Sequence, residues 1–199
     1  MKSLTLVLAL SGLTLGLPAM ADSPVVRIRG TIEAVDGTSV TIKPRIGTPV
    51  QVKLGDGVRV ATANTAKISD IQPDSYIGTA ATPQPDGTLK ALEVAVFAPS
   101  MRGTGDGHYP WDLEKENTMT NGAVGALSGT TDRTIRVTYK GGEKTITVPE
   151  GVPVVALAPG DASKIKPGAR VVAFTKAEAG GVAVADRMIV GENGTVPPM

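Results

Sequence analysis

"KISDIQPDSYIGTAATPQPDGTLKALEVAV", Lys67 to Val96, decides the fold, because its pattern returns 94 residues later as "DASKIKPGARVVAFTKAEAGGVAVADRMIV", Asp161 to Val190. Both stretches pass from a short polar turn through a Pro-led β-turn into β-branched and small residues. The match extends without a gap over Gly47–Val96 and Gly141–Val190. Turn residues and apolar phase agree over about fifty positions, which indicates an internal duplication.

Each copy has the pattern of short, half-buried strands. Apolar side chains alternate with Arg27, Arg29 and other polar residues over residues 26–34, and a period of two is typical of a strand with one buried face. Asp36-Gly37 and Asp86-Gly87 stand between such runs, where a tight hairpin turn needs positive backbone angles. No stretch has a sustained helical period, so the pattern predicts an all-β chain.

We predict two tandem small antiparallel barrels of five or six strands each, OB-like and related by duplication, since closure removes exposed strand edges. The first barrel spans 22–98 and the second spans 121–191. A long Gly-rich strap, 99–120, joins them, and 192–199 form a C-terminal tail. A unit of about 70 residues buries only about 60% of its surface, so the two should pack together. The nearest alternative is one barrel built from both halves.

The turn pattern also carries a family resemblance. "G-x-I/V-x-x-V", two hairpins, "I-x-P-G/D-x-x-V" and a closing strand after "D-G-T" resemble the exported bacterial domains of unknown function that are built from small OB-like repeats. The resemblance covers nearly the whole chain after the leader. It implies a fold and an exported location. Because that family has no settled activity, it implies no catalytic residue.

Residues 1–21 have the pattern of a signal peptide. Lys2 gives a short positive start, Leu4–Leu17 are mainly apolar, and Ala19-Met20-Ala21 is a small-x-small cleavage site. The apolar run is shorter than the about 20 residues of a membrane span. We therefore expect cleavage before Asp22, a periplasmic or secreted protein, and no membrane span after cleavage.

Composition excludes several function classes. The formal net charge is +1, there is no Cys and there is a single His. Nucleic-acid binders usually carry a basic field and stacking aromatics, which this chain lacks. Zinc sites need several His or Cys ligands. A hydrolytic triad at His108 would need a Ser and an acid in triad geometry, which the proximity of Ser100 and Asp106 or Asp112 in a loop does not supply, and the sequence contains no Gly-x-Ser-x-Gly elbow. We predict no enzyme activity and no cofactor.

The strap holds the most function-like residues. His108, Tyr109, Trp111 and Asp112 lie together in a Gly-rich segment that is longer than the usual connection of about 4 to 6 residues. Its aromatic side chains should dock it across the groove between the barrels, with Trp111 largely buried. Because loops on a rigid scaffold often carry function, these four residues are the candidate binding site for a protein or small-molecule partner in the envelope.

A metal site is the alternative use of the same segment. Met101, His108 and Met119 could converge on copper, since thioether and imidazole are donors that copper accepts. The same side chains are also ordinary packing residues, and packing is the favoured interpretation. The sequence therefore predicts an exported, non-catalytic binding or interaction module of the envelope. Its alternative is a periplasmic copper-handling protein.

Overall fold

The protein is all-β, as predicted. The computed structural model describes residues 25–128, 133–178 and 180–198, and the predicted leader lies outside them. None of the helical turns in these ranges has the length and apolar character that crossing a membrane requires. The 3-10 turns are η1 Ile68–Asp70, η2 Pro99–Met101 and η3 Ala162–Lys164, and the strands are β1 Val26–Asp36, β2 Ser39–Pro44, β3 Val50–Thr65, β4 Tyr76–Pro83, β5 Leu89–Phe97, β6 Gly107–Pro110, β7 Thr118–Ser128, β8 Thr134–Tyr139, β9 Gly142–Thr147, β10 Val154–Pro159, β11 Arg170–Ala177 and β12 Ala183–Gly191.

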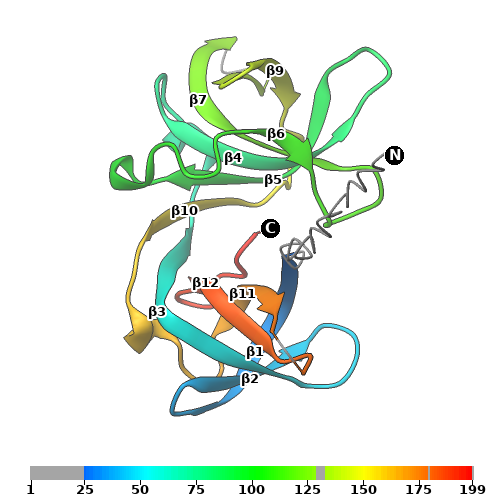
Figure 1. Ribbon diagram of the computed structural model, residues 1–199. Coiled ribbons are helices and arrows are strands. Elements are labelled where there is room, and N and C mark those ends of the chain that lie inside the picture. Colours follow the sequence, from blue (N-terminus) through cyan, green and yellow to red (C-terminus); the bar gives the residue numbers. More distant parts are fainter. Residues whose placement is uncertain (1–24, 129–132, 179, 199) are drawn as a thin grey trace, which may run out of the picture.

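Five strands close into a barrel in the order β1–β2–β3–β12–β11 and back to β1. Neighbours are antiparallel, except that β3 and β12 run parallel. In Figure 1 this barrel is the lower part, with blue and cyan strands beside orange and red ones. Its core contains Ile32, Ile42, Val52 and Met188, and the first three alternate along their strands with more exposed residues. The predicted period of two places these side chains inside.

The remaining long strands form a second group in the upper part of Figure 1. They pair antiparallel in the order β5–β4–β7–β8–β9. Two parallel residue pairs, Leu89 with Ile146 and Lys90 with Thr147, lead from β9 back to β5. Ile77, Leu89 and Ile146 belong to the buried cluster of this group.

Strands β3 and β10 connect the two groups. β3 is 16 residues long, and its last residues pair antiparallel with β10, with Ala63 opposite Leu157 near the centre. β10 also runs parallel to β5. A third buried cluster lies here and draws on both groups; its larger members include Phe97, Met119, Leu157 and Phe174. The two strand groups therefore share a core.

The pairing corrects the predicted domain boundaries. The closed barrel takes β1–β3 from residues 26–65 and β11–β12 from residues 170–191, so it is not the contiguous unit 22–98. The physical reason is the unbroken course of β3, which carries the chain out of the barrel before β4 begins. β4 then pairs with β7 from the other half, and β11 takes the place beside β1.

Two glycines lie where neighbouring strands approach each other closely. Gly30 in β1 lies between β11 and β2, and a Cβ there would overlap the backbone carbonyl oxygen of Lys43. Gly122 in β7 lies between β4 and the end of β8, and a Cβ there would overlap the carbonyl oxygen of Thr138. In both strands, the missing side chain lets a neighbouring backbone approach closely.

Candidate functional site: the strap and an arginine groove

Hydrogen bonds at several points hold the strap against the rest of the fold. The guanidinium of Arg102 donates to the backbone carbonyl and the carboxylate of Asp74, at 2.8 and 2.7 Å. The carboxylate of Asp106 accepts from the backbone N–H of Lys140 at 2.6 Å. β6 then pairs with β7, so the last residues of the predicted 99–120 segment belong to a strand. The strap is a docked element of the fold.

Trp111 closes the space between the two strand groups. Its ring is half-buried and packs on the shared cluster. The guanidinium of Arg27 lies over the ring, with its Cζ 3.6 Å from the centroid. The backbone N–H of Trp111 donates to the carbonyl of Asn117 at 2.9 Å. The anchoring role predicted for this residue agrees with these contacts, although the ring is less enclosed than expected.

Under the ring lies a cavity of about 50 Å³, whose walls include Tyr109, Met119 and Arg187. Sites for small organic ligands usually have volumes of about 300–1,000 Å³. A cavity of this size holds only a few water molecules. The interior beneath the strap is therefore not a small-molecule pocket in this conformation.

Asp112 joins the strap to β1. Its carboxylate is 2.7 Å from the guanidinium of Arg29 and 3.1 Å from that of Arg27. Partial burial alone would raise the pKa of Asp112, but the hydrogen bond and charge of Arg29, together with Arg27, outweigh it and hold the pKa below its usual value. The side chain of Asp112 remains 43% exposed, so these arginines meet a carboxylate at the surface.

His108 lies on the other face of β6. Its Nδ1 is 2.8 Å from the hydroxyl of Thr120, and its ring stacks on Tyr139 with centroids 5.9 Å apart. Burial, with a smaller effect from the charge of Lys144, lowers the pKa of His108. Both effects favour the neutral imidazole. Since Thr120 is completely buried, the His–Thr pair offers no accessible nucleophile to a substrate.

The three donors of the copper hypothesis do not lie together. Tyr109 pairs with Met119 across β6 and β7, whereas His108 pairs with Thr120. Adjacent residues of a strand point to opposite faces, so His108 faces away from Met119. Met101 and Met119 line the cavity under Trp111. A search of the described residues also finds no cluster of three or more His, Cys, Asp or Glu side chains suited to a metal.

An open groove beside β1 is the feature that the sequence analysis missed. Its volume is about 380 Å³, and it lies next to the strap. Arg27 and Arg29 were recognised only as the polar phase of a strand, and Arg45 lies in the bend after β2. Asp112 lies more than 80 residues later in the sequence, and the fold brings it to these arginines. No local sequence pattern encodes this contact. We call this surface the arginine groove; its lining residues are Arg27, Ile28, Arg29, Pro44, Arg45, Ile46, Val50 and Leu113.

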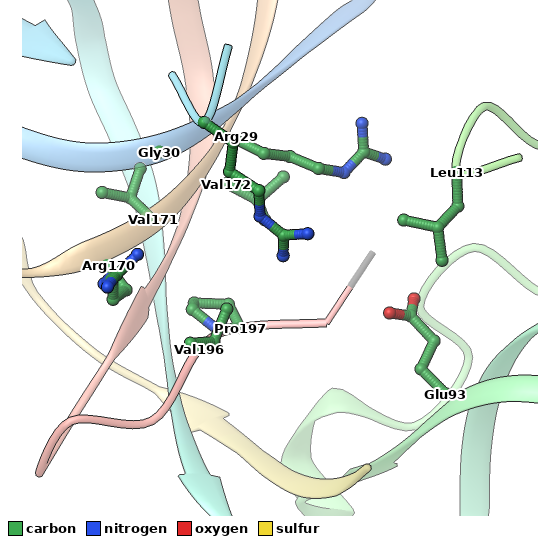
Figure 2. A pocket seen from close by; sticks show the side chains of 10 residues that line it. Arg29, Gly30, Glu93, Leu113, Arg170, Val171, Val172, Val196 and Pro197 are labelled. Atoms are coloured by element: carbon green, nitrogen blue, oxygen red, sulfur yellow. The ribbon is translucent and has the colours of Figure 1, made fainter. Parts of the chain in front are cut away.

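A smaller pocket adjoins the groove. Figure 2 shows Arg29 and Arg170 of the barrel on one side, Glu93 of β5 on the other, and the C-terminal segment with Pro197 passing between them. The side chain of Glu93 is only 5% exposed. The tail after Gly191 is thus packed into the molecule, and Pro197 and Pro198 are buried.

Comparison with protein-family models, with curated proteins and with solved structures finds no match. The resemblance to exported OB-like repeats therefore remains a prediction from the sequence.

Proposed function

We propose that this protein is a non-catalytic binding module of the cell envelope, exported by residues 1–21, and that its binding surface is the arginine groove. One observation carries the proposal: the groove is open, and its eight lining residues include three arginines and no acid. Arginine presents a planar fork of donors that matches carboxylate and phosphate groups. A partner with anionic groups is the ligand that this surface fits.

Asp112 supports the same assignment. One carboxylate from the strap already sits against Arg27 and Arg29, while Arg45 is exposed and has no ion pair within the described part of the chain. The groove thus keeps an excess of positive charge although the whole chain is close to neutral. A local field of this kind raises the association rate of an oppositely charged partner.

Replacing Arg45 by alanine should weaken binding of poly-glutamate about three- to tenfold, because one exposed charge of the groove is lost. The readout is the fluorescence of Trp111, the only tryptophan, whose ring touches Arg27. Arg136→Ala is the matched control, since Arg136 is an exposed arginine of β8 in the other strand group. Equal loss in both variants would reduce the effect to net charge and contradict the proposal.

We also propose that the chain is a duplicated unit whose two copies have exchanged their last two strands, so that the second strand group is a barrel equivalent to the first. The hairpins β4–β5 and β11–β12 support this, because Ile77 pairs with Val96 and, 94 residues on, Val171 pairs with Val190. Their register shifts also coincide, between Ala80 and Ala81 and 94 residues later.

The junction supports the exchange as well. The antiparallel β3–β10 pair places Ala63 opposite Leu157, and these residues are themselves 94 apart. Equivalent backbone bonds flank the centre, from Ala66 to Val154 and from Gly160 to Val60. Such a pattern is expected where two copies of one unit meet about a local two-fold axis.

Cutting the strap at a protease site inserted between Gly103 and Gly107 should therefore leave the two fragments bound to each other. Each fragment supplies strands to the pairs β1–β11 and β4–β7, so separation requires unfolding. Size-exclusion chromatography after cleavage measures this, with urea as the control that releases them. Fragments that separate in native buffer and each keep a folded β spectrum would contradict the exchange.

A further inference from the structure

The strap supplies a strand to one half of the molecule that the other half lacks. β6 pairs with one edge of β7 over residues 118–121, and β4 pairs with the other edge. β1 is the counterpart of β7: Arg27 pairs with Phe174 of β11, and Met119 pairs with Ala80, the residue 94 positions before Phe174. Over residues 26–28, β11 lies on one edge of β1, and no described strand lies on the other.

The backbone of Arg27 faces that open edge. Ile32 exchanges hydrogen bonds with Gly168 and Ala169, on the β11 side. Residues of an antiparallel strand direct their backbone groups alternately to the two edges. The backbone N–H and C=O of Ile28 therefore point to β11, and those of Arg27 point away from β11. Met119 has the same orientation toward β6, because Asn117, two residues earlier, accepts from Trp111.

The arginine groove lies along this edge. Arg27 and Ile28 line it from β1, and Pro44, Ile46 and Val50 line it from the β2–β3 hairpin. Ile46 is 92% exposed, so its apolar side chain is available for contact at the groove. An added strand would thus find backbone donors, an apolar floor and positive charge side by side.

We infer that the groove takes an extended peptide as a sixth strand on β1, antiparallel to it, in the position that β6 occupies on β7. This inference rests on the proposed binding role of the groove. Addition of a strand to a sheet edge is a common mode of peptide recognition, in which main-chain bonds give affinity and alternate side chains give specificity. Here the chain itself contains the precedent, in β6.

The register of β6 on β7 also predicts which residue types the peptide carries at each position. Gly107, His108 and Tyr109 lie opposite Asn121, Thr120 and Met119. The corresponding peptide residues would lie opposite Arg29, Ile28 and Arg27. Arg27 and Arg29 share the single carboxylate of Asp112, so one positive charge remains in excess. Opposite charges across an antiparallel pair stabilise it, so the flanking residues are acidic.

The central residue of the peptide is apolar. His108 stacks on Tyr139, and Pro44 occupies the place of Tyr139 because Lys43 and Thr138 are the equivalent partners of the first strands. A side chain in the position of His108 would thus meet Ile28 and Pro44. The occupant is an acidic–apolar–acidic segment of a partner protein. A second copy of this chain is disfavoured, because antiparallel β1 edges would bring arginines of both copies together.

The test uses the purified protein and the blocked peptide Thr-Glu-Ile-Glu-Thr, with Trp111 fluorescence as the readout. The scrambled peptide Thr-Glu-Glu-Ile-Thr has equal charge and should bind at least tenfold more weakly. N-methylation of the second Glu removes the donor opposite Arg27 and should also weaken binding at least tenfold. N-methylation of Ile is the matched control, because that N–H points away from β1, and it should change affinity less than threefold.

The outcomes separate this inference from the proposed function. Equal binding of the alternating and scrambled peptides, or equal effects of the two N-methyl groups, overturns strand addition and leaves anion binding by the groove intact. Binding of poly-glutamate without binding of either peptide also overturns strand addition and leaves anion binding by the groove intact. If poly-glutamate and both peptides all fail to bind, the proposed function fails too, and the arginines then only protect an edge from aggregation.

Discussion

Replacing Trp111 by alanine should lower the free energy of unfolding by about 2 kcal/mol. This is less than the about 3–5 kcal/mol for truncation of a fully buried Trp or Phe, because the ring of Trp111 is only half-buried. The substitution removes contacts with the shared cluster and leaves the guanidinium of Arg27, now stacked at 3.6 Å, without its aromatic face. Urea unfolding followed by circular dichroism measures the change.

Two further variants serve as controls, one at Trp111 and one at the neighbouring aromatic residue His108. Trp111→Phe keeps an aromatic ring and should retain about half of the lost stability. His108→Ala should cost about 1 kcal/mol, since it removes one hydrogen bond to the buried hydroxyl of Thr120 and a ring contact at the edge of the fold. A Trp111→Ala variant that unfolds at the same urea concentration as the parent protein would show that the strap does not anchor the two strand groups.

Replacing Gly122 by alanine should cost about 3 kcal/mol, and Gly30→Ala should cost a similar amount. Overpacking of a rigid site usually costs about 1–3 kcal/mol, and here the new Cβ would strike backbone atoms, which no change of rotamer can move. The obstacle is the carbonyl oxygen of Thr138 at Gly122 and that of Lys43 at Gly30. Thermal unfolding of the two variants measures both effects.

Gly125 is the matched control on the same strand, β7. A Cβ at Gly125 would have its nearest neighbour at 3.7 Å, the carbonyl oxygen of Arg136, which is ordinary contact. Gly125→Ala should therefore change stability by less than about 0.5 kcal/mol, because reduced freedom of the unfolded chain offsets small losses. If Gly122→Ala were equally mild, the close approach of β7 to β8 would not constrain the fold.

The sequence predicts the local structure well because local structure depends on period and turn chemistry. The alternation in residues 26–34 places Ile32 in the core and the arginines on the other face. Gly37 and Gly87 lie in the two predicted turns, and both have positive φ, at 57° and 84°; Asp36 is the last residue of β1. The strap docks between the strand groups, as the aromatic side chains of Tyr109 and Trp111 indicate.

The order of the strands in space could not be predicted from the same patterns. β4 and β11 have the same apolar phase, so the sequence does not distinguish which of them pairs with β1. The outcome depends on whether the chain turns back after Val60 or continues straight to Thr65. No pattern of residue types within one strand encodes that choice.

The candidate site was only partly predictable for a related reason. Asp112 and Trp111 were named from their setting in the strap, whereas Arg27 and Arg29 became candidates only when the structure placed them beside these residues. Ion pairs between distant segments depend on how strands are ordered in space. The copper hypothesis chose three donor residues by their chemical type alone. In the structure, His108 lies on the face of β6 that points away from Met119.

The pairing of β1 with β11 determines when this protein can fold. Val26 accepts a hydrogen bond from Thr175, 149 residues later in the chain, so the barrel cannot close before its last strands have been synthesised and, in an exported protein, carried across the membrane. Contacts of such high sequence separation slow folding. The first half of the chain must wait with unpaired strand edges, a state prone to aggregation.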